Sequence, residues 1–223
     1  MTMKFLAAAV LLAGVGFASQ ASAANIVQNG SFETGNFTNW TLGGTDGGAP
    51  AVVISYNSTS SYPHGAFGEP VPPNNAATNS PDAAGTYAAY FVDDFAAETL
   101  TQTVHLTPGV YQIGFSAYLP QNGYTNVGDA TFTGSIAGVT LANFDANSQT
   151  PVAWESFAGS TTITMEGDYQ VAFTFNTNNS PSKDVVIDQV YIIPGNPVPE
   201  PASFAILGAG LAGLGLTRLR RRS

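Results

Sequence analysis

Hydrophobic and polar residues alternate with a period of two through most of the chain. The clearest runs are 100–106, 111–117 and 169–176, where one face is apolar and the other is polar or small. Strict alternation of this kind is typical of half-buried β-strands. The last run, Val185–Ile193, is apolar on both faces except at two polar positions, which predicts a strand buried on both sides.

Shorter alternating runs predict six further strands, separated by Gly-, Pro- and Asn-containing turns. These strands are expected at 40–42, 52–56, 87–92, 130–136, 139–144 and 156–165. No part of 24–197 shows a sustained 3.6-residue period, so no helix is expected there. About ten short strands at this spacing predict an all-β domain, a jelly-roll β-sandwich.

One long segment, 57–86, interrupts the alternation. It contains five prolines among many Ser, Asn, Gly and Ala residues. A connection of about 30 residues is far longer than is usual in a compact domain. Two interpretations stay open: a disordered or loosely packed cover, or a binding loop whose contact residues are Tyr62, His64 and Phe67.

The N-terminal residues 1–23 have the composition of a secretory signal peptide. Lys4 precedes the uncharged apolar stretch 5–18, and Ala21-Ser22-Ala23 supplies a small-x-small cleavage pattern. A buried N-terminal helix is the alternative, but the order of the three parts favours export through the Sec machinery. The mature chain is then expected to begin near Ala24.

The C-terminal end also has three parts in a fixed order. They are Val198, Pro199, Glu200 and Pro201; an apolar segment, 202–217; and Arg218, Arg220, Arg221 and Arg222. A helix over the apolar residues 202–216 spans roughly 22 Å, against roughly 30 Å for the hydrocarbon core of a bilayer. A weak membrane-spanning helix is therefore predicted rather than a buried one, with the arginines on the cytoplasmic side and the preceding domain outside.

These three parts together resemble the PEP-CTERM sorting signal of Gram-negative bacteria, over residues 198–223. A tail of this kind is also known as the C-terminal domain of certain ice-binding proteins. The resemblance implies processing by an exosortase near the Pro-Glu-Pro sequence. It further implies that the protein is transiently anchored in the inner membrane, with its domain in the periplasm, before it reaches the cell surface or extracellular matrix.

Charge is distributed unevenly between the ends and the domain. Residues 24–197 hold one lysine, Lys183, against fourteen acidic residues, a formal charge of −13. This balance argues against nucleic acid as a partner and favours binding of a divalent cation. The chain has no cysteine, which excludes disulfides, a thiol nucleophile and cysteine-based metal sites.

Three segments of the domain resemble carbohydrate-binding modules of the galactose-binding-like superfamily. They are the opening segment 25–33 followed by Trp40, the stretch 99–117, and the last strand 184–190. The resemblance implies a jelly roll and suggests sugar binding, although function belongs to sites rather than folds. Phe32 and Trp40 are expected in the core because their aromatic surface is large.

Several relatives of this fold hold a structural calcium ion near the chain termini, and Glu33 and Asp188 are the matching positions here. Calcium takes about six to eight oxygen ligands, so backbone carbonyls and water would have to complete the site. The alternative is that Glu33 is a solvated acid and Asp188 caps a sheet edge. The family's second acid on the last strand is Gln189 in this chain.

Candidate binding residues are the tyrosines at predicted strand ends or in loops, Tyr56, Tyr118 and Tyr124. Their rings could stack on the faces of sugars, and the alternative is partial burial under loops. Thr99, Thr101 and Thr103 form one short threonine row, and Thr162 with Thr164 a shorter one. Neither row is expected to repeat across many strands, which weakens an ice-binding interpretation.

Catalytic chemistry has little support in the sequence. The densest acidic cluster, Asp93, Asp94 and Glu98, is expected to be a solvated loop or minor calcium site, since adjacent strand residues point to opposite faces. His64 and His105 are expected to be ordinary surface histidines. We therefore predict no catalytic residues and a non-enzymatic surface or matrix protein, with exopolysaccharide as its candidate ligand. The alternatives are an ice- or surface-binding protein and a secreted glycan hydrolase.

Overall fold

The computed structural model describes residues 23–44, 48–95, 97–121, 126 and 128–195. These residues all belong to one compact unit, Ala23–Val198. The predicted signal sequence up to residue 22, Tyr124, the sorting-signal residues and the predicted membrane helix over 202–217 lie outside the described residues. Within the described part of the chain, no helix is long and apolar enough to cross a membrane.

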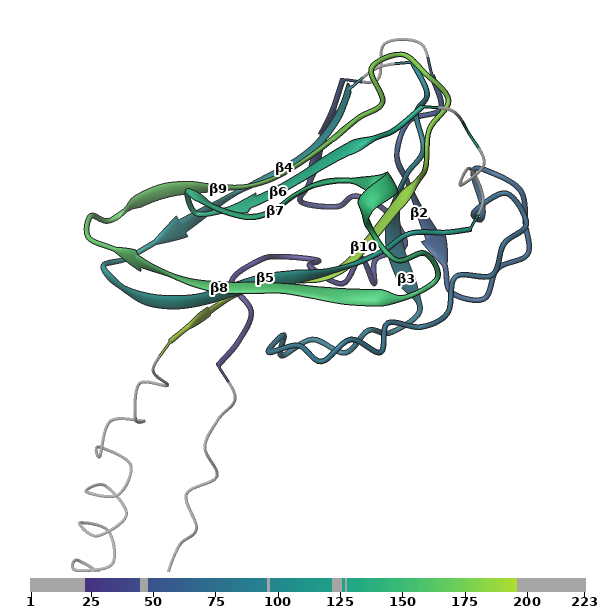
Figure 1. Cartoon of the computed structure of the whole chain (residues 1–223). Coiled ribbons are helices and arrows are strands. Elements are labelled where there is room, and N and C mark those ends of the chain that lie inside the picture. Colours follow the sequence, from purple (N-terminus) through teal and green to yellow (C-terminus); the bar gives the residue numbers. More distant parts are fainter. Residues whose placement is uncertain (1–22, 45–47, 96, 122–125, 127, 196–223) are drawn as a thin grey trace, which may run out of the picture. The chain divides into compact units, whose positions relative to one another are not determined.

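Ten strands form two antiparallel five-stranded sheets (Figure 1). Sheet A has the order β1 (Thr41–Gly43), β4 (Ala97–Leu106), β9 (Gly167–Asn176), β6 (Thr131–Ile136) and β7 (Val139–Asp145). Sheet B has the order β2 (Val52–Ser55), β3 (Tyr87–Phe91), β10 (Val185–Pro194), β5 (Gly109–Tyr118) and β8 (Trp154–Ile163). One short 3₁₀ turn, η1 (Ala146–Ser148), follows β7. The predicted all-β sandwich is confirmed, and every predicted strand is present with ends shifted by a few residues.

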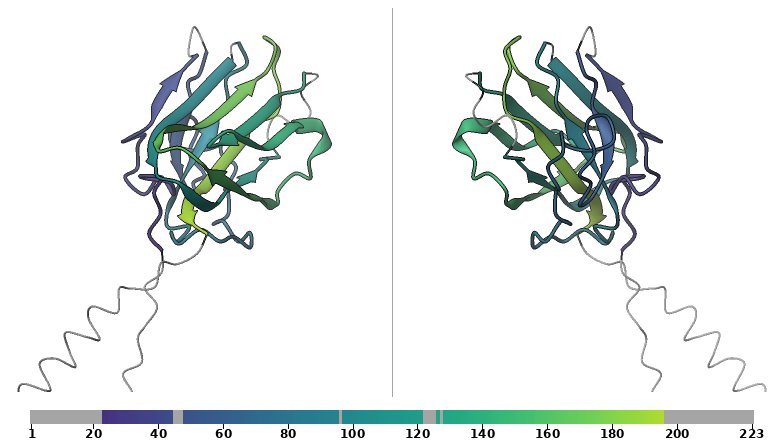
Figure 2. Two further views of the ribbon diagram at one scale, coloured as in Figure 1. Left: turned by 90° about the vertical axis from the view of Figure 1, so that its left-hand side faces the viewer. Right: turned by 90° about the vertical axis from the view of Figure 1, so that its right-hand side faces the viewer.

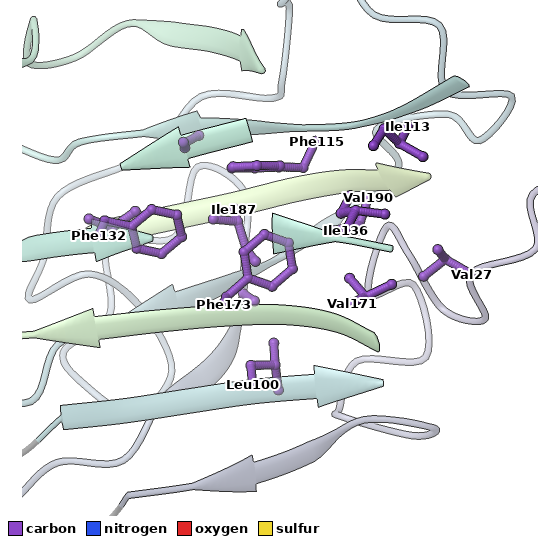
Figure 3. Packing of buried hydrophobic residues seen from close by; sticks show 14 of the residues in the cluster. Val27, Leu100, Ile113, Phe115, Phe132, Ile136, Val171, Phe173, Ile187 and Val190 are labelled. Carbon is purple, nitrogen blue, oxygen red and sulfur yellow. The ribbon is translucent and has the colours of Figure 1, made fainter. Parts of the chain in front are cut away.

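The core lies between the two sheets and is rich in phenylalanine (Figure 3). Phe115 of β5 and Phe173 of β9 meet edge to face at 4.9 Å between ring centroids, and Phe132 of β6 packs on Phe173 at 6.0 Å. Gly134 makes room for them, because a Cβ there would lie 2.6 Å from the Phe115 ring. Phe32 and Trp40 are buried in this core, as predicted.

The N-terminal segment extends sheet B beside β10 (Figure 2). The Ile26 amide donates to the Ile192 carbonyl at 2.9 Å, and the Val190 amide donates to the Gly30 carbonyl at 2.9 Å. The register of β10 against β5 shifts between Asp188 and Tyr191. Gln189, inside this irregularity, has a φ of +50°. Asp188 and Tyr191 consequently both lie on the outer side of the sheet.

A second hydrophobic cluster covers the outer face of sheet B. Strand residues such as Ile54, Tyr90 and Val186 pack there against Ala66 and Val71 of the proline-rich segment. We call this segment, residues 57–86, the cover. In Figure 1 part of it runs along the side of sheet B that faces away from sheet A. It explains why Val185–Ile192 is buried on both faces, as the sequence predicted.

Hydrogen bonds fix the cover at both ends and in the middle. The Tyr56 amide donates to the Thr86 carbonyl, and the Asn57 amide to the Val71 carbonyl, each at 2.8 Å. The indole Nε1 of Trp154 donates to the Pro72 carbonyl at 2.9 Å. The segment therefore follows a defined path over sheet B, which argues against the disordered interpretation, and the binding-loop interpretation stays a prediction. Its apolar contacts are mostly small residues, which gave little signal in the sequence.

Candidate functional site

The outer face of sheet A is a polar surface built from strand residues in register. Thr99 of β4 lies opposite Thr174 of β9, and Thr174 lies opposite Thr133 of β6. The Thr133 hydroxyl in turn donates to Asn143 Oδ1 of β7 at 3.4 Å. Neighbouring strands lie about 4.8 Å apart, so these side chains form a regular row across four strands.

A second row runs parallel to the first across the same sheet. It joins Thr41 of β1, Thr101 of β4, Ala172 of β9 and Ser135 of β6. We call the two rows together the threonine face. The predicted row of Thr99, Thr101 and Thr103 repeats on the next strand only at Thr99, because Thr101 and Thr103 lie opposite Ala172 and Gln170 of β9. Antiparallel pairing brings Thr174 and Thr133, from distant parts of the chain, into register with Thr99, which the sequence alone did not predict.

The single histidine of β4 lies at one end of this face and is paired with two acids. His105 Nδ1 is 2.9 Å from Asp168 Oδ1, and its Nε2 is 3.1 Å from Glu166 Oε1. These hydrogen bonds, that to Asp168 foremost, raise the pKa of His105 above its usual value. All three side chains are exposed, so the group is a surface ion pair at the edge of the threonine face.

Two of the predicted sugar-stacking tyrosines are buried beneath the cover. Tyr118 is 2% exposed and its ring centroid lies 5.3 Å from that of Trp154. Tyr56 packs edge-on against the same Trp154, and its hydroxyl donates to Asp188 Oδ2 at 2.5 Å. Burial and the neighbouring Asp188 carboxylate raise the pKa of Tyr56. Their rings offer no free face, so a stacking role at Tyr56 and Tyr118 stays a prediction that requires the cover to open.

The cover itself presents a different aromatic pair at its surface. Tyr62 and Phe67 stack with ring centroids 5.9 Å apart and planes 18° from parallel. Phe67 is 49% exposed and has a φ of +46°. The Tyr62 hydroxyl donates to the Pro50 carbonyl at 2.9 Å, and this hydrogen bond fixes the position of the Tyr62 ring. The sequence indicated these two as contact residues, but neither the stack nor the unusual backbone could be read from it.

Glu33 and Asp188, the predicted calcium ligands, are already engaged with the protein. Glu33 Oε1 accepts the amides of Thr86 and Tyr87 at 2.8 and 2.9 Å. Asp188 Oδ2 accepts the Tyr56 hydroxyl, while its buried Oδ1 has no hydrogen-bond partner. Among the described residues, no three His, Cys, Asp or Glu side chains gather around a common point. Calcium at Glu33 and Asp188 therefore stays a prediction that two side chains alone do not satisfy.

Gln189, where the family has a second acid, also bonds inside the protein. Its Nε2 donates to the Asp82 carbonyl, and its Oε1 accepts Asn74 Nδ2, each at 2.8 Å. These bonds tie the last strand to the cover. Burial raises the pKa of Asp188 to about 7, against the lowering effect of its hydrogen bonds.

The acidic cluster of Asp93, Asp94 and Glu98 is largely buried, contrary to the expected solvated loop. Glu98 Oε1 accepts the Ala51 amide at 2.5 Å, and Asp94 Oδ1 accepts the Ser182 amide at 3.1 Å. Asp93 Oδ1 accepts the Phe95 amide at 2.7 Å. Burial raises the pKa of Glu98 to about 7. Each carboxylate thus orders the surrounding backbone, which is a structural role.

A further buried acid stands on the outer side of sheet B. Asp184 accepts a hydrogen bond from the Tyr90 hydroxyl, and both side chains are almost completely buried. Burial raises the pKa of Asp184 to about 8. This pair could not be predicted from the sequence, because Tyr90 and Asp184 lie 94 residues apart.

Comparison with known proteins identifies the C-terminal end of the chain. Residues 197–222 match the PEP-CTERM protein-sorting motif. The chain carries a PEP-CTERM sorting signal. This motif implies export, processing by an exosortase and sorting to the cell envelope of a Gram-negative bacterium. No curated protein matches the chain.

Solved structures resemble the domain rather than the tail. One is the carbohydrate-binding module TmCBM61 in complex with β-1,4-galactotriose, with 20% identity and a TM-score of 0.50 over 77% of this chain and 99% of that chain. Another is a family 16 carbohydrate-binding module, with 14% identity and a TM-score of 0.41 over 76% of this chain and 99% of that chain. A third is the CBM22-2 xylan-binding domain of Paenibacillus barcinonensis Xyn10C, with 12% identity and a TM-score of 0.37 over 73% of this chain and 96% of that chain. The likeness to TmCBM61 shows that the domain has the jelly-roll fold of that module.

Proposed function

We propose that this PEP-CTERM protein is a non-enzymatic surface or matrix protein whose jelly roll binds a glycan, with exopolysaccharide as the candidate ligand. On this proposal the Sec machinery exports the chain, the tail holds it transiently in the inner membrane, and an exosortase then processes it. The matched sorting motif supports this sequence of events, and the likeness of the fold to a carbohydrate-binding module supports the proposal of a glycan ligand.

The observation that carries the glycan proposal is the threonine face. Residues 57–86 cover part of the outer face of sheet B, whereas the outer side chains of sheet A present hydroxyl and amide groups in register, as at Thr99, Thr174 and Thr133. An extended sugar chain offers hydroxyls at regular intervals, and a row of hydroxyls across a sheet can bond to several of them at once. Each bond to a neutral group contributes modestly, so affinity would come from their number.

The absence of enzymatic activity is part of the proposal and rests on how the acids are used. A glycosidase needs two carboxyl groups across an accessible cleft. Glu98 and Asp93 are both fully buried; both oxygens of Glu98 and Oδ1 of Asp93 accept backbone amides, while the buried Oδ2 of Asp93 has no hydrogen-bond partner. An arrangement of this kind favours a structural role for the acids over hydrolysis.

Affinity electrophoresis tests the glycan proposal. Residues 24–197, which form their own core, are run through gels that contain neutral or acidic polysaccharides. The variant Thr99→Val/Thr133→Val/Thr174→Val keeps the branched shape that suits strands and removes three hydroxyls. We expect this variant to bind the polysaccharide that retards the wild type with an affinity at least about tenfold lower. The matched control, Thr162→Val on β8, changes an exposed threonine of sheet B and is expected to bind as the wild type does.

A wild-type domain that no polysaccharide retards would contradict the glycan proposal.

The rows of threonines also favour a second candidate, ice binding, because ice presents a regular surface to which a flat hydroxyl array can bond. The same wild-type and triple-variant proteins separate the two. Inhibition of ice recrystallisation by the wild type alone, without retardation in any gel, would assign the threonine face to ice.

A further inference from the structure

The exposed phenylalanine of the cover is not explained by folding. Among the described residues, five large apolar side chains are well exposed, at Phe67, Phe95, Val110, Val152 and Met165. Of these five side chains, Phe67 is the one that stacks on another aromatic ring, that of Tyr62. Its backbone also has a positive φ, +46°, which glycine or asparagine adopts more readily than a bulky residue. Val152 shares the exposure and the positive φ, at 54% and +54°, so the stack on Tyr62 is the feature that distinguishes Phe67 and points to a functional reason for its presence.

The surrounding turn holds this ring in place. The Gly68 amide donates to the Ser60 carbonyl at 2.9 Å, and the His64 amide to the Ser61 carbonyl at 3.0 Å. Ala66, next to Phe67, is 1% exposed and belongs to the cluster on sheet B. Ala66 thus anchors the turn in the cluster on sheet B, while the neighbouring Phe67 is exposed to solvent. A preorganised ring loses little conformational freedom when a ligand binds.

The ring of Phe67 lies nearly parallel to that of Tyr62 and offset from it, with centroids 5.9 Å apart, and about half of the Phe67 surface, 49%, is exposed. The axial C–H groups of a pyranose form an apolar face that packs on such a ring, while the sugar hydroxyls stay in contact with water and polar neighbours. Polar groups are close in the sequence of the turn, since Ser60, Ser61 and His64 are exposed. The surface therefore offers both elements that a single sugar ring needs.

The negative charge near the stack favours neutral sugars over acidic ones as ligands. Burial first, and then the carboxylates of Glu98 and Asp93, raise the pKa of Tyr62, so a negative potential reaches the stack. Residues 24–197 as a whole carry a formal charge of −13. A uronic acid or sulfated sugar placed on Phe67 would be repelled, whereas a neutral pyranose would not.

We infer that Tyr62 and Phe67, which we call the aromatic platform, form a stacking subsite for a neutral pyranose unit on the surface of the cover. The inference rests on the proposed glycan binding and gives it a second, separate location with a defined ligand class. The two locations allow the domain to engage glycan at two separate surfaces.

The test measures affinity for neutral galactan and xylan and for polygalacturonate by affinity electrophoresis of residues 24–197. We expect Phe67→Ala to reduce the affinity for the neutral polysaccharide by about tenfold, the usual scale for loss of one aromatic contact. Phe67→Trp, which keeps a stacking ring, is expected to retain binding. Phe95→Ala is the matched control, because it removes another exposed phenylalanine outside the cover.

The outcomes distinguish the inference from the proposed function. Wild-type retardation that Phe67→Ala leaves unchanged overturns the aromatic platform and leaves glycan binding standing. Retardation by polygalacturonate alone, lost in Phe67→Ala, overturns the assignment of a neutral sugar. Failure of the wild type to bind any polysaccharide overturns the proposed function itself. An unchanged thermal midpoint in Phe67→Ala shows that a loss of affinity does not come from unfolding.

Discussion

At the scale of single residues, the outer side of sheet B is held by buried acids that each accept a tyrosine hydroxyl. Asp188 with Tyr56 and Asp184 with Tyr90 follow this pattern. A buried carboxyl without a donor is costly, because it loses its hydration and gains nothing in return. The tyrosine that supplies the donor is thus more important for stability than its ring alone suggests.

Replacing Tyr56 by phenylalanine tests this view directly. The variant keeps the ring against Trp154 and removes the hydrogen bond to Asp188, so we expect the free energy of unfolding to fall by about 1–3 kcal/mol. Urea denaturation at pH 7 measures it. Tyr169→Phe is the control, since the Tyr169 hydroxyl donates to the Met165 carbonyl at an exposed site. Equal losses in both variants would contradict a special role for the buried pair.

At the scale of elements, the cover is as much part of the fold as the strands are. Its sequence suggested a loop, because its apolar residues are sparse and small, as at Ala66, Val71 and Ala76. One signal did point to it: the run 185–193 is apolar on both faces, and a strand of that kind needs a layer on each side. The sequence could show that sheet B is covered, but not which segment covers it.

Trp154 is the residue that connects the cover to β8, and Trp154→Ala is expected to loosen it. Removal of the ring takes away contacts with Tyr56 and Tyr118 and the hydrogen bond to Pro72. We expect a loss of about 3–5 kcal/mol in the free energy of unfolding and faster proteolysis within 57–86. Mass spectrometry of limited-digestion products locates the cuts. Val152→Ala, at an exposed position two residues away, serves as the control. Cleavage of both variants at the wild-type rate would show that the cover does not depend on Trp154.

The threonine face illustrates what alternation can and cannot predict. The pattern placed Thr99, Thr101 and Thr103 on one face of a strand, which the structure confirms. It could not place Thr174 and Thr133 beside them, because the register between strands depends on turns and loops that the alternation within one strand does not describe. Candidate sites that lie within one strand were therefore foreseeable, and sites assembled across strands were not.

At the scale of the whole molecule, buried acids make the stability of the domain depend on pH. The pKa values are raised by burial to about 8 for Asp184 and about 7 for Asp188 and Glu98. In the unfolded chain such groups titrate near pH 4. Between these values the folded state binds more protons than the unfolded state, so the stability falls as the pH rises.

We therefore expect the thermal midpoint of residues 24–197 to fall by at least about 5 °C between pH 5 and pH 8.5, since 1 kcal/mol shifts the midpoint of a domain of this size by about 2–4 °C. Calorimetry at constant ionic strength with a chelator present measures the profile. Working above pH 5 avoids the titration of exposed acids. The double variant Asp184→Asn/Asp188→Asn keeps acceptors for the hydroxyls of Tyr90 and Tyr56 and removes two of the titrating groups. Its profile is expected to be flatter, and a wild-type midpoint that rises over this range would contradict the buried acids as the cause.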